Sequence, residues 1–126
     1  MKRRNFIASA SLLASTGTVS AAAKKPLLHH VFFWLNNPDS EADKNALIAG
    51  LNTLRAIPSI QRMHVGVLAS TEKRDVVDTS WDVSEIMFFN DATGQKVYQD
   101  HPLHMEFVKN CAHLWKKVLV YDAQDV

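Results

Sequence analysis

Four stretches rich in apolar residues predict β-strands at residues 27–35, 60–68, 81–89 and 115–122. Three of them are apolar at both odd and even positions, a pattern typical of strands that are covered on both sides. In the first strand, one face would carry Leu27, His29, Val31, Phe33 and Leu35, and the other Leu28, His30, Phe32 and Trp34. In the last strand, one face would carry Trp115, Leu119 and Tyr121, and the other Val118 and Val120.

Three helices are predicted between these strands from apolar residues at helical spacing. The first covers residues 41–56 and follows Ser40, which suits an N-cap. The second is short, starts at Asp91 and runs through Tyr98. The third begins at Pro102, because proline suits the first turn of a helix. The apolar stripes consist of Leu47, Leu51 and Leu54 on the first helix and Leu103, Phe107, Cys111 and Leu114 on the third.

The order of these elements is β-α-β-β-α-β, with the second helix broken in two. This is the ferredoxin-like arrangement of an α+β fold, in which helices cover one face of a four-stranded sheet. The second face is also apolar here, so a partner chain or a ligand must cover it. A homodimer that packs sheet against sheet satisfies this requirement most simply, and we therefore expect one.

The first 23 residues have the order of a secretory signal peptide: a basic N-terminal region, a mildly apolar central region and a cleavage region of small residues. Arg3-Arg4-Asn5-Phe6-Ile7 also resembles the twin-arginine pattern. The apolar stretch is too short and too polar to span a membrane. We expect cleavage near Lys24, a mature domain at residues 24–126, and a periplasmic or secreted bacterial protein.

Charge and cysteine content narrow the function classes further. The whole chain has 14 Lys+Arg and 13 Asp+Glu. Removal of Lys2, Arg3 and Arg4 leaves 11 basic and 13 acidic residues, a formal charge of −2. The mature sequence has no basic stripe that would indicate nucleic-acid binding. The single cysteine, Cys111, excludes an internal disulfide and falls on an apolar helical stripe, where it is expected in the core.

A phenol and two imidazoles occur within seven residues, Tyr98 to His104. His104 would lie in the first turn of the third helix, where exposed backbone N–H groups and the helix dipole disfavour extra positive charge. A neutral imidazole beside a tyrosine hydroxyl is a candidate acid–base pair near neutral pH. His101 sits at the N-cap position, for which a structural role is the simpler interpretation.

A metal centre is the alternative interpretation of these histidines. His101 and His104 are three residues apart at a helix start, and His30 could approach them in space to hold zinc. His101 as a cap would point away from His104, however, and no cysteine or carboxylate cluster completes the set. We therefore expect a pocket without metal or other cofactor.

The chain resembles the stress-responsive dimeric α/β-barrel (Dabb) domains over residues 28–122. The residues that carry the resemblance are His30-Val31-Phe32-Phe33, Ile57-Pro58-Ser59-Ile60, Gly66, Glu85-Ile86-Met87-Phe88-Phe89, Tyr98-Gln99-Asp100-His101-Pro102-Leu103-His104 and Val120-Tyr121-Asp122. The tyrosine followed by His-Pro-x-His is the specific part. The resemblance implies a dimer whose two sheets form a barrel around or beside a ligand pocket.

Within this family, plant polyketide cyclases use a tyrosine and a histidine at the positions of Tyr98 and His104. The resemblance thus implies His104 as a base, Tyr98 as a hydrogen-bond donor and His30 as an assisting histidine. Asp82 falls where the cyclases carry another imidazole, so a different ligand is expected. Ligand contacts are predicted for Asp82, His101 and Phe32.

Two functions from different classes are compatible with the sequence. The first is binding of a small apolar or aromatic ligand, with proton-transfer chemistry of the cyclase or isomerase kind on a carbonyl compound. The second is a non-catalytic stress-response or interaction module, in which the joint between Tyr98 and His104 is structural. They differ in whether these two side chains converge on an open pocket or pack into the core.

Overall fold

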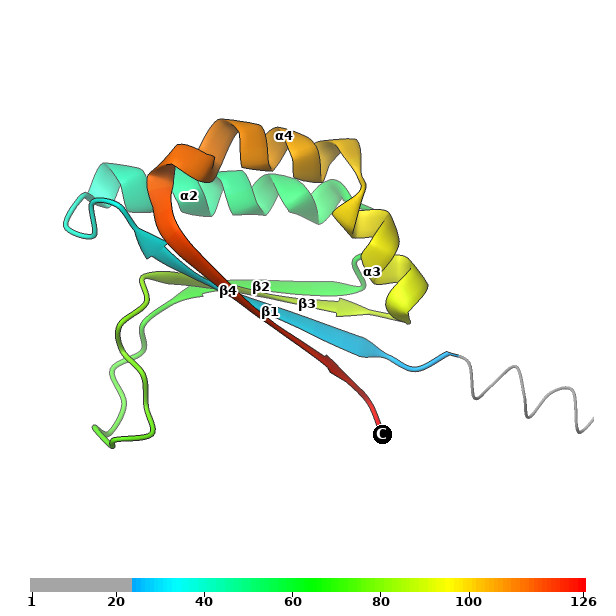
Figure 1. Cartoon of the computed structure of the whole chain (residues 1–126), viewed down its shortest axis with the longest axis horizontal. Helices are drawn as coiled ribbons and strands as arrows, with labels where there is room; N and C mark the ends of the chain where they lie inside the picture. The colour runs from blue at the N-terminus through cyan, green and yellow to red at the C-terminus, as the bar shows by residue number, and fades with distance from the viewer. Residues whose placement is uncertain (1–23) are drawn as a thin grey trace, which may run out of the picture.

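A four-stranded antiparallel sheet forms one layer of the structure, a computed structural model that describes residues 24–126 (Figure 1). The predicted signal peptide, residues 1–23, lies outside the described residues. The strands are β1 (Leu27–Leu35), β2 (Arg62–Val67), β3 (Val83–Phe89) and β4 (Trp115–Gln124), in the order β2-β3-β1-β4. This element order and sheet confirm the ferredoxin-like α+β fold.

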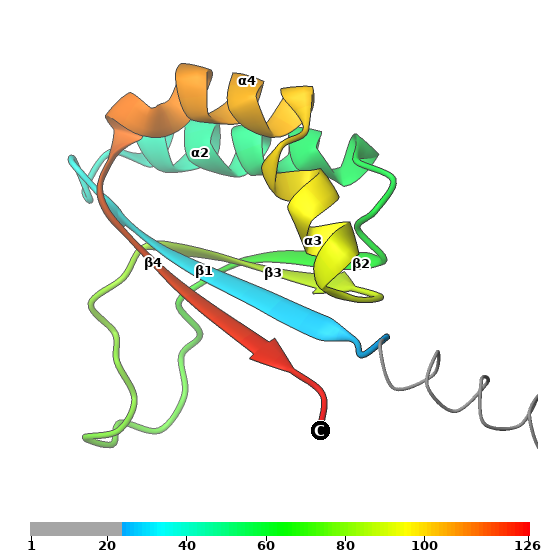
Figure 2. The ribbon, with the colours of Figure 1, turned by 45° about the vertical axis from the view of Figure 1, so that its right-hand side comes forward.

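The second layer consists of helices on one face of the sheet, with α2 and α4 side by side and α3 beside the end of β3 (Figure 2). The helices are α2 (Glu41–Thr53), α3 (Ala92–Gln99) and α4 (Pro102–Cys111), and the 3₁₀ turns η1 (Leu54–Ala56) and η2 (Ala112–Leu114) follow α2 and α4. Within the described range of 24–126, no helix is long and apolar enough to span a membrane.

Local sequence signals begin each helix as predicted. The Ser40 hydroxyl accepts a hydrogen bond from the Asp43 backbone N–H at 3.1 Å and caps α2. The Asp91 carboxylate accepts one from the Gly94 N–H at 2.9 Å and caps α3. Each cap pairs a backbone donor that has no partner within its own helix.

The core lies between the sheet and α2 and α4, where the predicted helical stripes are buried. The two helices are in close contact at Gly50, because a Cβ there would lie 2.5 Å from the Cys111 sulfur. Cys111 is buried in this contact, as expected from the helical stripe. The absence of a side chain at Gly50 thus lets α4 pack directly on α2.

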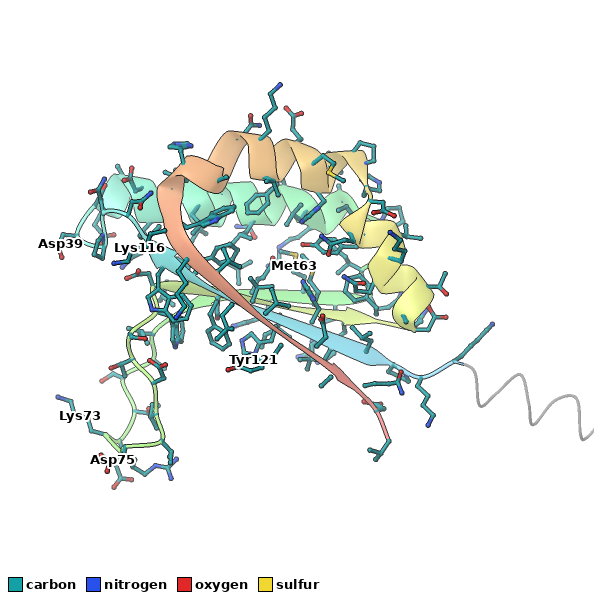
Figure 3. All side chains as sticks on the ribbon, viewed as in Figure 1. Asp39, Met63, Lys73, Asp75, Lys116 and Tyr121 are labelled. Carbon is teal, nitrogen blue, oxygen red and sulfur yellow. The ribbon has the colours of Figure 1, made fainter. Side chains whose placement is uncertain are left out.

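The two faces of β1 have different surroundings. His29, Val31, Phe33 and Leu35 are buried toward the helices, whereas His30, Phe32 and Trp34 point to the other side. On that open face, the Phe32 ring contacts Trp81 and Tyr121, with ring centroids 5.3 and 6.2 Å away. Figure 3 shows Met63 directed toward the helices and Tyr121 directed away from them. Tyr121 is 59% exposed, so this aromatic face is uncovered in the single chain.

A β-bulge changes one predicted side-chain direction. The pairing of β1 with β4 shifts register between Trp34 and Leu35, so Trp115 opposes Leu35. The Trp115 ring consequently packs on the helix side, 5.0 Å from the Phe33 ring and stacked at 5.6 Å on Phe107. Its predicted placement with Leu119 and Tyr121 was wrong, because an extra residue in one strand reverses the alternation beyond it.

Candidate functional site

A pocket of about 190 Å³ lies between the sheet and the helices α3 and α4. Its walls are mainly apolar and come from β1, α4 and β4, while its polar groups come from β1, β3, α3 and α4. The apolar lining consists of Val31, Phe33, Phe107, Val108, Trp115, Val118 and Val120, and the polar lining of His29, Glu85, Tyr98, Gln99 and His104. An apolar cavity of about 150 Å³ accepts benzene, so this volume suits a ligand built on one ring.

Tyr98 lies between two imidazoles in this pocket. Its ring centroid is 4.8 Å from that of His104 and 5.6 Å from that of His29. Burial raises the pKa of the Tyr98 phenol well above its usual value, and the nearby Glu85 carboxyl raises it further. The phenol therefore keeps its proton at neutral pH and is a hydrogen-bond donor.

His104 is a neutral imidazole in which one ring nitrogen has no proton. Its Nδ1 lies 3.0 Å from the carbonyl oxygen of Gln99. Because a carbonyl oxygen only accepts, Nδ1 carries the hydrogen and Nε2 is the unprotonated nitrogen. Burial lowers the pKa of His104, and the hydrogen bond to Gln99 opposes this only in part. His104 Nε2 is thus a proton acceptor at neutral pH.

His29 is oriented by a carboxylate from the far end of the chain. Its Nδ1 lies 2.5 Å from an oxygen of Asp122, which follows the pocket-lining part of β4 and is 49% exposed. The carboxylate accepts, so Nδ1 donates, and Nε2 is the ring nitrogen that is not bonded to Asp122. A carboxylate bonded to one ring nitrogen fixes the orientation of the imidazole.

Glu85 is an acidic residue on the buried face of β3. It is 2% exposed, and among residues 24–126 its Oε2 has no hydrogen-bond partner. Burial raises the pKa of its carboxyl to about 8. The carboxyl is therefore neutral at neutral pH and carries a proton into the same pocket as Tyr98.

The structure brings together Tyr98 and His104 but not His30. The His30 ring lies on the open face of the sheet, 4.2 Å from the Phe32 ring. The histidine that joins the pair is the preceding one, His29. The predicted convergence of His30 with Tyr98 and His104 is therefore corrected, because alternate residues of a strand point to opposite faces. His29 and His30 do face opposite sides, as the strand pattern predicts.

Phe32 also lies away from this pocket. It lines a separate groove of about 290 Å³ on the open face, together with Trp34, Asp78, Trp81, Leu119 and Tyr121. A ligand contact by Phe32 would therefore belong to a different site from that of Tyr98 and His104.

Asp82 and His101 make structural hydrogen bonds and do not line the pocket. The Asp82 carboxylate accepts from the backbone N–H of Leu35 at 2.8 Å, where the register of β1 changes. His101 Nδ1 accepts from the backbone N–H of Leu103 at 3.0 Å and caps α4, with Pro102 in the first turn. The cap role agrees with the structural interpretation of His101.

The sequence interpretation missed three polar groups of the site, namely His29, Asp122 and Glu85. Glu85 had a detectable signal, because it shares the alternating face of Val83, Met87 and Phe89 in its strand. An acidic residue at such an inward position is unusual unless it is paired or functional. Asp122 had no comparable signal, since it is 93 residues from His29 in the chain.

The described part of the chain, residues 24–126, has no group of three or more His, Cys, Asp or Glu side chains placed to hold a metal ion. His101 and His104 are both tied to backbone groups, through Leu103 and Gln99 respectively. The pocket places the Tyr98 phenol near two imidazoles, with the buried Glu85 carboxyl in the same lining.

Several solved structures have the same fold at low sequence identity. A Dabb family protein from Mesorhizobium loti is 21% identical with a TM-score of 0.66, covering 81% of this chain and 98% of its own. A dimeric ferredoxin-like protein of unknown function from Thermobifida fusca is 19% identical with a TM-score of 0.64, covering 79% and 91%. A hydroxynitrile lyase from Passiflora edulis is 17% identical with a TM-score of 0.67, covering 81% and 94%.

A search of the curated proteins finds no significant match to this sequence. The structural similarities lie below 25% identity and establish the fold alone. The family is established by a sequence model instead, since the model of the "Stress responsive A/B Barrel Domain" matches residues 27–125. This span covers every strand and helix that the structure describes within residues 24–126. The chain belongs to the Dabb family of stress-responsive A/B barrel domains.

Proposed function

We propose that this protein binds a small, neutral, apolar or aromatic carbonyl compound and catalyses proton transfer on it, as in a lyase, cyclase or isomerase. The observation that carries the proposal is the position of the Tyr98 phenol between two imidazoles in a pocket with apolar walls. The Nδ1 of each imidazole is bonded to an acceptor oxygen, and the Nε2 of the neutral His104 is free to take a proton. Perturbed titratable groups that converge in one pocket are typical of an active site.

The proposed reaction begins with a ligand whose carbonyl oxygen accepts a hydrogen bond from Tyr98. His104 Nε2 removes a proton from the carbon next to the carbonyl, and the C–H electron pair moves to form an enolate. The negative charge develops on the oxygen that faces the Tyr98 hydroxyl, which stabilises it. The enolate carbon then takes a proton back or forms a bond to a second carbonyl carbon, and the imidazolium returns its proton to the product.

His29 is the second imidazole of the proposed site, in the place for which the sequence suggested His30. Its hydrogen bond to Asp122 holds the ring near Tyr98. His29 is thus suited to exchange a proton with the ligand oxygen or with Tyr98 while His104 acts on the carbon. The hydroxynitrile lyase among the similar structures is an enzyme with this fold.

Replacement of Tyr98 by phenylalanine tests the proposal, with acetophenone as the probe. In D₂O at neutral pH, the wild-type protein should accelerate the exchange of the acetophenone methyl protons for deuterium, measured by ¹H NMR. Tyr98→Phe keeps the ring but removes the donor, and should lower the exchange rate about 10²-fold. Exchange by the wild-type protein no faster than by buffer would contradict catalysis and favour the non-catalytic module.

We also propose that two copies pack through the open face of the sheet. Dimeric ferredoxin-like proteins occur among the similar structures, and the exposed aromatic face around Phe32 and Tyr121 supports such a contact. Phe32→Asp should convert the dimer to a monomer in multi-angle light scattering, because it places a charge in the contact. Val76→Asp is the control, at an 80% exposed position in the loop between β2 and β3, and it should leave the dimer intact. A Phe32→Asp variant that stays dimeric would rule out this face.

The export of the protein is a further part of the proposal. The order of basic, weakly apolar and small residues at positions 1–23 supports a signal peptide, and the twin-arginine-like start supports transport of a folded protein. The mature domain would then act in the periplasm or outside the cell.

A further inference from the structure

Glu85 is a buried acid whose proton has no acceptor in the described part of the chain. The carboxyl lies on β3 at the position opposite Val31 of β1 and Val65 of β2, and it lines the pocket. Its Oε2 is buried and has no hydrogen-bond partner among residues 24–126. A buried polar group left without a partner costs about 1–3 kcal/mol. Such a group therefore calls for a partner that arrives with the ligand.

Burial favours the neutral form of Glu85. His29 faces it from β1, Tyr98 from α3 and His104 from α4, while β4 contributes Asp122 behind His29. No lysine or arginine of the described residues lines the pocket, so no permanent positive charge is placed to balance a carboxylate. An isolated carboxylate in such a site is far less favourable than the protonated acid. The acid has one O–H donor, and this donor is available to a ligand.

We propose that Glu85 contacts the ligand directly, by donating its carboxyl proton in a hydrogen bond to the same ligand oxygen that Tyr98 binds. Two donors from neutral groups then face one oxygen, so the ligand must present an oxygen that can accept two hydrogen bonds. A neutral acid in an apolar site can also stabilise the negative charge of an enolate oxygen. The inference rests on the proposed function for the location of the oxygen, but not for turnover.

The protonation of Glu85 can be measured directly by ¹³C NMR on protein labelled at the side-chain carboxyl of glutamate. The chain has four glutamates, Glu41, Glu72, Glu85 and Glu106, so the spectrum is simple. Glu85→Gln assigns the resonance, and Glu106→Gln on the exposed side of α4 is the matched control. The Glu85 signal should remain that of an acid at pH 7 and titrate near pH 8, and acetophenone should shift it. A Glu85 signal that titrates in the ordinary carboxyl range would overturn the inference.

Ligand affinity gives a second readout that does not depend on turnover. The Kd of acetophenone should rise about tenfold from pH 7 to pH 9 in the wild-type protein, because the donor is lost as Glu85 ionises. Glu85→Gln keeps an N–H donor and should show little of this rise, whereas Glu85→Leu should bind about tenfold more weakly at pH 7. The Glu106→Gln protein should follow the wild type at every pH.

The outcomes separate this inference from the proposed function. Binding that depends on Glu85 without deuterium exchange would support the inference and contradict catalysis. A second outcome is deuterium exchange by the wild type together with a Kd whose pH dependence is the same in the wild type and in Glu85→Gln. That outcome would support catalysis and overturn the inference. Tighter binding of 1-phenylethylamine than of acetophenone would mark Glu85 as a carboxylate site for an amine. Absence of acetophenone binding would also overturn the inference.

Discussion

Between pH 5 and pH 8, the wild-type protein is expected to lose about 3 kcal/mol of unfolding free energy that a Glu85→Gln variant retains. The physical reason is the difference between the two states of one carboxyl group. Burial raises its pKa to about 8 in the folded protein, whereas the unfolded chain has the ordinary value of 4.5. The expected loss is a large fraction of the stability of a domain of this size.

The direction of the effect follows from proton counting. Between the two pKa values the folded protein holds the Glu85 proton and the unfolded chain has released it. The folded state thus binds more protons, and a rise in pH favours the unfolded state. Two histidines have the opposite effect on the unfolding free energy at lower pH, where a rise in pH stabilises the folded state. The reason is that burial lowers the pKa of His30 and His104 in the folded protein. Both proteins contain these histidines, so their contribution cancels when the unfolding free energy of Glu85→Gln is subtracted from that of the wild type.

Urea unfolding at pH 5, 6, 7 and 8 measures this difference, with the free energy of each variant extrapolated to water. Glutamine has nearly the shape of glutamic acid, so the two proteins should be similar at pH 5 and diverge toward pH 8. Glu106→Gln, at an exposed position on α4, should run parallel to the wild type. A wild-type profile parallel to that of Glu85→Gln would show that Glu85 ionises normally in the folded protein.

Replacement of His104 by alanine is expected to lower the acetophenone exchange rate by about 10²–10³-fold, because the proposed base is lost. The pKa of His104 is lowered by burial, so its neutral form should remain available somewhat below pH 6.5. The wild-type rate should accordingly stay nearly constant between pH 7 and pH 6.5. The variant should still fold, since His104 is only half-buried and its one hydrogen bond is to a backbone carbonyl.

Two other histidine variants decide whether this loss is specific. His30→Ala should retain most of the exchange rate, because His30 lies on the opposite face of the sheet. His113→Ala should equal the wild type, since its side chain is exposed on η2. A loss in His30→Ala as large as that in His104→Ala would contradict the placement of the site on the helix side. Unfolding of His104→Ala in circular dichroism would instead mark His104 as structural.

The local parts of the structure were predictable because their signals lie within a few residues of one another. Ser40 and Asp91 begin helices through hydrogen bonds to N–H groups three residues away. The contact between Tyr98 and His104 is also local, because the two residues lie six positions apart on either side of the short connection between α3 and α4. The order of strands and helices then restricts the topology to few choices, among which the ferredoxin-like sheet is one.

The amino-acid sequence by itself thus determined the elements, their order and the pairing of the phenol with His104. Only the tertiary structure decided which face of β1 meets the helices. Both faces of that strand are apolar, so the alternation of side chains does not indicate which set is buried. That choice selects His29 over His30 and brings Asp122 and Glu85 to the same pocket from strands distant in the chain. Strand pairing and helix docking act over these long separations, and no local pattern records them.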